Sequence, residues 1–354
     1  MTKRTPRDGA TGHRPVTLEH VAQVAGVSRA TVSRVVNGSP AVAPAIRRAV
    51  QKAIAATNYV PNRAARSLVT RTTDSIALLV SEPDDPSGGV PFVGRVFNDP
   101  HFGRIASGLL ATLRPLGIQL VLMVANDEES RTQVLHYLRS GHVDGVVLLS
   151  NRSSDPLPAV LAEERIPVVL SARPPTPLPI GYVEADQRAG VALAVDRLVG
   201  LGRRRIATIT GPLDEPPGHE RLDAFRESLR RHRLTEAGVA EGHFTQIGGS
   251  RAMRELLDAA PGMDGVFIAS DLMALGTMPV LQQYGLRVPE DVAVIGFDDS
   301  SAALACEPPL TTVRQPVEEM SGRMAELLLA QIGAPDAPVQ SSWFTPSLVI
   351  RDSA

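Results

Sequence analysis

The sequence predicts a small, all-helical segment near the N-terminus followed by a large α/β body with two lobes. Three observations lead to this fold class. The 354 residues exceed one ordinary domain and suffice for several, each with its own apolar core. Basic residues concentrate in the first 71 positions. Through the remainder, apolar runs of strand length alternate with helical segments, which is the pattern of βαβ construction.

The formal net charge of -2 hides a strong asymmetry along the chain. Residues 1–71 contain twelve Lys or Arg and two acidic residues, whereas the remainder contains 24 basic and 36 acidic residues. These counts give net charges of +10 and -12. A basic segment on an acidic body is typical of a polyanion-binding module joined to a domain that binds another partner. The alternative is a solvated basic arm, which we assign to residues 1–15 alone.

The composition excludes several classes of protein. A single cysteine excludes a disulfide scaffold and a Cys-based zinc module, and it fits a reducing compartment. No apolar run approaches the roughly 18 to 20 residues needed to cross a bilayer. The polar, basic N-terminus lacks the apolar core of a signal peptide. We therefore expect a cytoplasmic protein without a membrane partner.

Residues 16–61 are predicted to form a helix-turn-helix. Thr17 precedes LEHVAQVA, whose apolar residues recur at helical spacing, and Thr is a favoured N-cap. Gly26 then interrupts the pattern, as expected for the short turn between two crossed helices. Ser28 caps a second helix, RATVSRVVN, and Pro44 suits the first turn of a third.

The outer face of the second helix suits the DNA major groove. This face is narrow, carries short side chains near its start and ends in a guanidinium. Arg bonds guanine O6 and N7 with two hydrogen bonds, and hydroxyl or amide groups bond phosphates. The predicted base-facing residues are Arg29, Ala30, Ser33 and Arg34, and the predicted phosphate contacts are Thr31 and Asn37.

Residues 62–73 are predicted to form a hinge helix and linker. Pro61 ends the third helix, and NRAARSLV has the length of about two turns, which is marginal for a helix alone in water. We expect it to order only against DNA or a second copy of the chain. Ala65 is small enough for close approach, and Leu68 is apolar without an obvious core, as in minor-groove wedges. The alternative is that Leu68 packs against the next domain.

The body, residues 74–354, is predicted to contain parallel sheets buried on both faces, because its apolar runs are continuous rather than alternating. About ten such strands would exceed one comfortable sheet, which favours two lobes. The clearest runs are SIALLV (75–80), IQLVLMVA (118–125), GVVLLS (145–150), IPVVLSA (166–172), RIATITG (205–211), GVFIAS (265–270) and VAVIGFD (292–298).

Polar residues follow several of these runs, where open α/β sheets bind ligands. Asp271 and Asp298 stand at strand ends, and Arg221 lies on a helix that follows a strand. Carboxylates accept hydrogen bonds from hydroxyl groups, and Arg donates a planar fork. With an aromatic face beside them, these groups suit a polyol or sugar. Arg173 follows another strand and is expected to face the same cleft, whereas Asp271 has helix capping as its alternative role.

No motif supports an enzyme. The chain has no G-x-x-x-x-G-K-[ST] loop, no G-x-G-x-x-G after the first strand and no G-x-S-x-G elbow. Cys306 has no neighbouring His in sequence, and His219 and His243 lack metal-ligand spacing. We expect neither a cofactor nor a metal. A sugar-binding protein without gene regulation, exported or cytoplasmic, would share the body but not the basic head.

The stretch VTLEHVAQVAGVSRATVSRVVNGSPAVAPAIRRAVQKAIAATNYVPNRAARSL resembles the DNA-binding head and hinge of the lactose/galactose-repressor (LacI/GalR) family, element by element. The resemblance implies that Arg29, Ala30 and Arg34 contact bases. It also implies that Leu68, with Ala65 beside it, enters the central base step of a pseudo-palindromic operator. Tyr59 and Asn62 would then help to hold the DNA backbone.

The body also resembles this family, in SDLMALG (270–276), GFDDS (296–300) and PPLTTVRQP (308–316). The resemblance implies two periplasmic-binding-protein-like (type I) lobes with an effector between them. The N-lobe would comprise about 74–181 plus 313–341, and the C-lobe about 182–312 plus 342–354. Ala172, where many relatives have Asp, and the long loop after the first strand depart from the family pattern. The implied effector contacts are Arg221, Asp271, Asp298 and Gln315, with Phe102, Tyr182 and Phe244 as candidate stacking walls.

The resemblance further implies a homodimer that binds two operator half-sites and responds to an effector. A carbohydrate is favoured over a nucleobase or nucleoside, and induction and co-repression both stay open. The last residues carry no a/d heptad pattern, so we expect a dimer rather than a coiled-coil tetramer.

Overall fold

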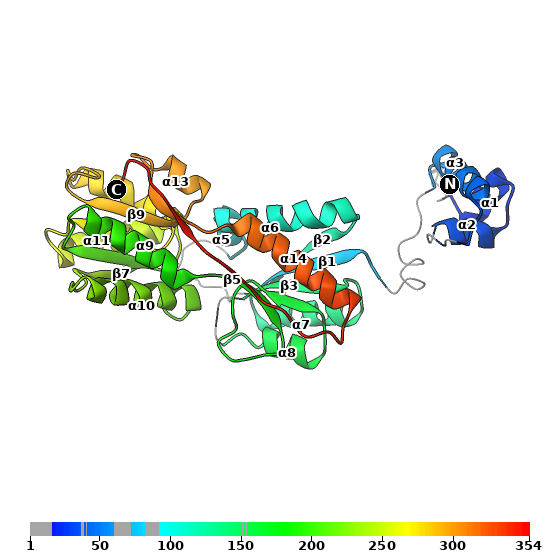
Figure 1. Cartoon of the computed structure of the whole chain (residues 1–354), viewed down its shortest axis with the longest axis horizontal. Coiled ribbons are helices and arrows are strands. Elements are labelled where there is room, and N and C mark those ends of the chain that lie inside the picture. Colours follow the sequence, from blue (N-terminus) through cyan, green and yellow to red (C-terminus); the bar gives the residue numbers. More distant parts are fainter. Residues whose placement is uncertain are drawn as a thin grey trace, which may run out of the picture. The chain divides into compact units, whose positions relative to one another are not determined.

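A computed structural model describes most of the chain. The described residues are 16–36, 39, 41–59, 72–81, 92–150, 152 and 154–354. The chain forms two units, Met1–Thr73 and Asp74–Ala354, and each is described by itself (Figure 1). The predicted basic arm and most of the predicted hinge, including Asn62, Ala65 and Leu68, lie outside the described residues, as does Asn37.

The first unit is the predicted helix-turn-helix with a third helix. Its helices are α1 (Leu18–Ala25), α2 (Arg29–Val36) and α3 (Pro44–Thr57). Thr17 caps α1, and its side chain accepts a hydrogen bond from the backbone N–H of His20 at 3.4 Å. Gly26 ends α1 with φ 66°, a left-handed conformation that favours glycine. One apolar cluster joins the three helices: Val21, Ala22, Val32, Val35, Val42, Val50, Ala53 and Tyr59.

The second unit contains two six-stranded sheets, one in each lobe, which confirms the predicted fold class. The N-lobe sheet has the order β11-β5-β4-β3-β1-β2 and the C-lobe sheet has the order β12-β10-β9-β8-β6-β7. All their pairs are parallel except β10 with β12. The strands are β1 (Ser75–Ser81), β2 (Gln119–Ala125), β3 (Gly145–Ser150), β4 (Val168–Leu170), β5 (Gly181–Ala185), β6 (Ile206–Thr210), β7 (Val239–Glu241), β8 (Gly265–Ile268), β9 (Ala293–Asp298), β10 (Thr311–Arg314), β11 (Ser342–Phe344) and β12 (Ser347–Val349).

Helices cover both sheets. In the N-lobe, α6 and α14 lie side by side (Figure 1), and their apolar faces form one cluster with β1 and β5. The helices of this unit are α5 (Phe92–Asn98), α6 (Pro100–Leu113), the 3-10 helix η2 (Arg114–Leu116), α7 (Glu128–Arg139), α8 (Leu157–Glu163), α9 (Gln187–Gly200), α10 (Pro216–Arg231), α11 (Gln246–Ala259), α12 (Asp271–Gln283), α13 (Ser301–Ala305) and α14 (Val317–Gly333).

The chain passes between the lobes three times, a few residues later than we expected. Strand β5 pairs with β4 in the N-lobe, so the first crossing follows Ala185 rather than residue 181. Strand β10 pairs with β9, so the second follows Arg314, and β11 pairs with β5, so the third follows Phe344. The position of each crossing depends on which lobe's sheet the preceding strand joins. The apolar pattern of a single strand does not indicate which strand it pairs with.

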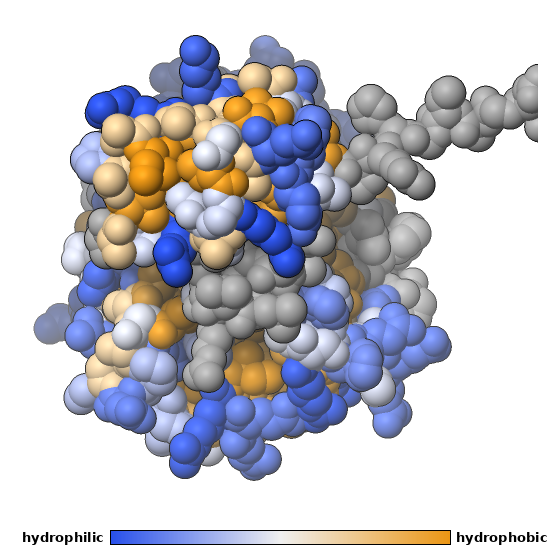
Figure 2. Space-filling model, turned by 90° about the vertical axis from the view of Figure 1, so that its right-hand side faces the viewer, coloured by the Kyte–Doolittle hydropathy of each residue, from blue (hydrophilic) through white to orange (hydrophobic). Residues whose placement is uncertain are grey.

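The exposure of the strands follows their place in each sheet. The central strands β6, β8 and β9 are buried along their whole length, as their continuous apolar runs predict. Strand β2 has an equally apolar sequence, yet it is an edge strand with exposed and half-buried residues. Apolar side chains (orange) therefore also reach the surface among hydrophilic ones (blue), as the face in Figure 2 illustrates. Among the described helices, none has the length and hydropathy required to span a membrane.

Candidate functional site

The outer face of α2 is the candidate DNA-contacting surface. Ser28 caps this helix, because its Oγ accepts a hydrogen bond from the backbone N–H of Thr31 at 3.1 Å. The two hydroxyl groups also bond each other at 2.9 Å, which places both at the start of the helix. Arg29, Ala30 and Arg34 are exposed. The face that we predicted to enter the major groove is thus open to solvent.

Arg29 is held only loosely by its protein partner. Its Nε lies 2.8 Å from Oε1 of Glu19, and the two side chains are 69% and 60% exposed. An ion pair this exposed is weak, since water screens both charges. A nucleic-acid group can therefore replace Glu19 at little cost.

Tyr59 has a different environment from the one we expected of a DNA-backbone contact. The side chain is only 8% exposed and packs in the core of the head. Its main contribution in this structure is to that core.

In the body, three hydrogen bonds and one ion pair join four side chains into a ring, which we call the cleft ring: Gln187, Arg221, Asp298 and Gln315. Arg221 Nε donates to Gln187 Oε1 at 2.8 Å, and Gln187 Nε2 donates to Gln315 Oε1 at 3.1 Å. Gln315 Nε2 donates to Asp298 Oδ1 at 2.8 Å, and that oxygen lies 3.9 Å from Arg221 Nη1. The structure thus brings together three of the predicted effector residues and adds Gln187.

Arg221 is the electrostatic centre of this ring. It is 6% exposed, and its guanidinium carbon lies 3.9 Å from the ring centroid of Phe297 and 5.8 Å from that of Phe244. Burial lowers the pKa of Arg221, whereas the carboxyl groups around it, foremost that of Asp298, oppose this shift. Guanidinium groups keep their proton in such surroundings, so Arg221 stays cationic.

Asp271 stands apart from the ring, with both carboxyl oxygens occupied by protein donors. Oδ2 accepts from the backbone N–H of Ser300 at 2.7 Å, and Oδ1 accepts from the Thr312 hydroxyl at 2.5 Å. The residue is fully buried, and burial raises its pKa to about 8. Ser270, not Asp271, caps α12. We therefore propose that Asp271 ties together the ends of the C-lobe strands rather than binding an effector.

The N-lobe contributes the start of α6 to this region. Asp99 caps α6 by accepting a hydrogen bond from the backbone N–H of His101 at 2.9 Å. Burial raises the pKa of Asp99, and the negative charge of Asp298 raises it too, whereas the positive charges of His101 and Arg221 oppose the shift. His101 Nδ1 is buried without a hydrogen-bond partner among the described residues.

Arg104, one turn further along α6, connects the two lobes. Its Nη1 donates to the carbonyl oxygen of Asp298 at 2.7 Å, and its Nη2 donates to that of Gln315 at 3.1 Å. The same guanidinium pairs with both oxygens of Glu318 on α14, at 2.7 and 2.8 Å. Arg104 thus links the backbone of two ring residues to both α6 and α14.

The predicted aromatic walls lie in three different places. Phe244, with φ 52°, stands over Gly211, where any side chain would collide with its ring. Phe102 packs on α6 against the N-lobe core, edge-on to Phe97 at 5.6 Å. Tyr182 stands edge-on to the exposed Trp343, with 6.0 Å between the ring centroids, and the guanidinium of Arg173 lies over the same indole.

Sequence reasoning missed Gln187, Asp99, His101 and Arg104. Gln187 had a usable signal, because it follows a strand end just as Asp298 does. The α6 residues had none, since a helix start on the opposite lobe joins the site only through the tertiary structure.

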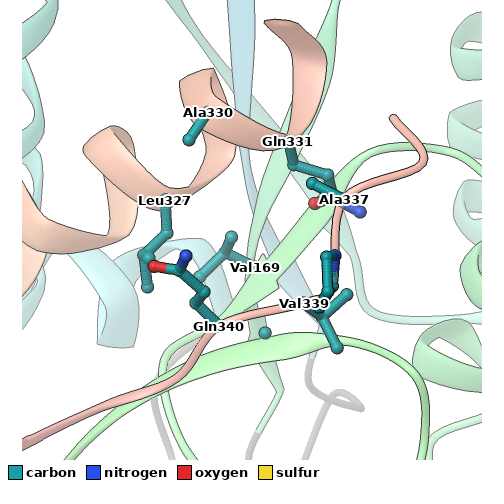
Figure 3. A pocket seen from close by; sticks show the side chains of 9 residues that line it. Val169, Leu327, Ala330, Gln331, Ala337, Val339 and Gln340 are labelled. Atoms are coloured by element: carbon teal, nitrogen blue, oxygen red, sulfur yellow. The ribbon is translucent and has the colours of Figure 1, made fainter. Parts of the chain in front are cut away.

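A cavity of about 50 Å³ lies in the N-lobe, between α14 and the segment that leads to β11 (Figure 3). It contains no residue of the cleft ring and no charged side chain. In the described part of the chain, no group of three His, Cys, Asp or Glu side chains could hold a metal ion.

Comparisons with known proteins agree with this architecture. Residues 17–62 match the family "Bacterial regulatory proteins, lacI family", and residues 195–354 match the "Periplasmic binding protein-like domain". The HTH-type transcriptional regulator CelR of Thermobifida fusca is 46% identical over 343 residues, 95% of this chain and 98% of that protein.

Two solved structures cover 96% of the chain. A complex of the transcriptional regulator CelR with cellobiose is 43% identical with a TM-score of 0.74, and all of that chain is covered. The lac repressor dimer bound to operator and the anti-inducer ONPF is 28% identical with a TM-score of 0.81, and 99% of that chain is covered. The exposed α2 face, the two-lobed body and these matches over nearly the whole chain together lead to one conclusion: the protein belongs to the lacI family of bacterial regulatory proteins.

Proposed function

We propose that this DNA-binding regulator is a cytoplasmic repressor whose operator affinity is controlled by a sugar bound at the cleft ring. The observation that carries the proposal is the ring itself, a buried set of hydrogen-bond donors and acceptors beside the N-lobe residues Asp99 and Arg104. It lies where the two lobes meet, so its occupant contacts both.

The chemistry of the ring suits a neutral polyhydroxyl ligand. Arg221 is balanced by Asp298, and two amide side chains complete the circle. A hydroxyl group both donates and accepts, so it can replace either neighbour in such a circle without leaving a buried charge unpaired. The aromatic ring of Phe244 adds an apolar face near Arg221. The cellobiose complex of the 43% identical regulator makes cellobiose the first sugar to test.

The proposed base contacts lie on the outer face of α2, at Arg29, Ala30, Ser33 and Arg34. Thr17, Ser28 and Thr31, at the starts of α1 and α2, are proposed to lie near phosphates. The operator-bound lac repressor is a dimer. By analogy, two heads of this protein would bind two half-sites of a pseudo-palindromic operator.

The coupling between sugar and DNA would run through Arg104. A sugar that displaces the cleft ring also displaces the carbonyl groups that Arg104 holds, and with them α6 and α14. The sugar changes operator affinity only as far as it binds one lobe arrangement better than the other. Whether it releases or strengthens DNA binding depends on the sign of that preference.

The test has two stages. Thermal unfolding of the full chain with cellobiose, glucose, adenosine and hypoxanthine should show stabilisation by a sugar, which reaches about 2.7 kcal/mol at a hundredfold excess over Kd. An operator is then selected from random duplex DNA, and its affinity is measured by fluorescence anisotropy with and without that sugar. Stabilisation by adenosine or hypoxanthine but by neither sugar would refute the sugar assignment. A sugar that binds without any change in operator affinity would refute the coupling.

A further inference from the structure

An aromatic and charged cluster lies at the edge of the N-lobe sheet, where β5 leads to Gln187 of the cleft ring. Trp343, the single tryptophan of the chain, is 54% exposed on β11. The guanidinium carbon of Arg173 lies 5.6 Å from its ring centroid, and the ring of Tyr182 stands edge-on at 6.0 Å. Large exposed aromatic rings with polar neighbours are typical components of ligand sites.

The sheet register adds Glu184 to this cluster. Strands β5 and β11 are parallel neighbours, and Trp343 is the register partner of Glu184. Partners in register point to the same face of a sheet, and so do residues two apart on one strand. The side chains of Tyr182, Glu184 and Trp343 therefore share one face. Both strands come directly before a crossing between the lobes.

Glu184 has an unused bonding position. The residue is 7% exposed, and its Oε2 is buried without a hydrogen-bond partner among the described residues. Buried polar atoms are normally paired, so an orphaned carboxyl oxygen indicates a missing donor. Burial, together with the charges of Glu220 and Asp186 and against that of Arg173, raises the pKa of Glu184 to about 7. Near neutral pH this carboxyl group can thus donate to a hydroxyl or accept from one.

Two pairs of consecutive residues connect the cluster with the cleft ring. In the first pair, the charge of Asp186 acts on Glu184, and Gln187 is a member of the ring. In the second, the charge of Glu220 acts on both Glu184 and Arg221. The cluster and the cleft ring therefore share two short segments of the chain, which is the arrangement expected if one ligand contacts both.

We propose that Trp343, Arg173, Tyr182 and Glu184 form a second sugar subsite, which takes the outer ring of a disaccharide whose inner ring lies at the cleft ring. This rests on the proposed function and extends it from sugars in general to disaccharides. The indole would pack on the apolar face of a pyranose, and Arg173 and Glu184 would bond its hydroxyl groups. Arg173 covers Trp343 in an exposed cation–π contact, which is weak enough for a sugar to replace.

The test uses the full chain and its single tryptophan as the reporter. Cellobiose should change the Trp343 emission, and in calorimetry Trp343→Ala should weaken cellobiose binding about tenfold while leaving glucose binding within about twofold. Trp343→Phe, which keeps an aromatic face, should retain most of the cellobiose affinity. Glu184→Ala should also weaken cellobiose more than glucose. Tyr284→Ala, at an exposed aromatic residue at the end of α12, is the matched control and should change neither sugar.

The outcomes separate this proposal from the proposed function. If Arg221→Ala abolishes cellobiose binding while Trp343→Ala binds both sugars as the unchanged protein does, the second subsite is refuted and the cleft ring stands. Equal losses of glucose and cellobiose in Trp343→Ala, with an unchanged unfolding temperature, would also refute it. If neither sugar binds the unchanged protein, the proposed function fails and the subsite with it.

Discussion

The head and the cleft differ in how far the residues proposed to bind a partner are buried and bonded to other side chains. On α2, Arg29 and Arg34 project into solvent, and the ion pair of Arg29 with Glu19 is exposed on both sides. In the cleft ring, Arg221 and Asp298 are buried and bonded to their neighbours. The α2 face therefore contributes little to folding, whereas the cleft ring contributes to folding and is also proposed to bind the sugar. Substitutions should separate binding from stability in the head and change both in the cleft.

The largest effect is expected for Arg221→Ala. It leaves the Asp298 carboxyl group buried without its cation, which costs about 3 to 5 kcal/mol when a buried pair is broken. Sugar binding should fall below detection by calorimetry, and urea unfolding followed by circular dichroism should report the loss of stability. Arg188→Ala on α9 is the matched control, because its pair with Glu227 is exposed and contributes little. Wild-type stability in Arg221→Ala would contradict the role given to the ring.

A smaller and purely functional effect is expected for Arg34→Ala on the exposed face of α2. Loss of one bidentate base contact costs about 1 to 3 kcal/mol, so operator affinity should fall between about fivefold and 150-fold in anisotropy titrations. Sugar affinity and the unfolding midpoint should stay unchanged. A comparable drop on non-operator DNA would show that Arg34 contacts phosphates instead of bases.

Asp271 is a third case, because its carboxyl group is buried but does not belong to the cleft ring. Its folded pKa of about 8 lies above the unfolded value, so its contribution to stability is full below about pH 4 and is lost as pH rises towards 8. This shift makes the free energy of unfolding, measured with urea, about 3 to 4 kcal/mol larger at pH 5 than at pH 8, and Asp271→Asn should remove most of that difference. Sugar affinity should change little. Loss of sugar binding would return Asp271 to the effector site.

The smallest effect is expected for Glu19→Gln in the head. It removes a weak exposed partner of Arg29, so the urea unfolding midpoint should stay unchanged. Operator affinity should rise by about twofold, because one negative charge leaves the DNA-facing side. The gain should shrink at high salt, and a decrease in affinity would mean that Glu19 positions Arg29 for DNA.

Much of this architecture could be predicted locally. The caps Thr17 and Ser28, the left-handed Gly26 and the strand runs depend on residues close in sequence, and these elements were confirmed. The placement of Arg221, Asp298 and Gln315 around one point also agrees with prediction, since carboxyl ends of parallel strands meet at one edge of a sheet.

Other features depend on contacts between segments that lie far apart in the sequence, and these contacts cannot be predicted from a local pattern. Asp271 and Asp298 both end strands, yet one accepts two protein donors and the other belongs to the ring, because different loops pack over them. Strands β2 and β9 are similarly apolar, yet one is an edge and the other is central.

By itself, the sequence determined the helical head, the alternating α/β body and the residues at strand ends, because short-range periodicity and backbone preferences set these. Only the tertiary structure decided that Arg104 connects the lobes, that Gln187 closes the ring and that Trp343 stands beside Glu184. Each of these contacts joins segments more than a hundred residues apart or depends on strand pairing. These contacts form only when the sheets and helices pack together, so they cannot be predicted from any single stretch of the sequence.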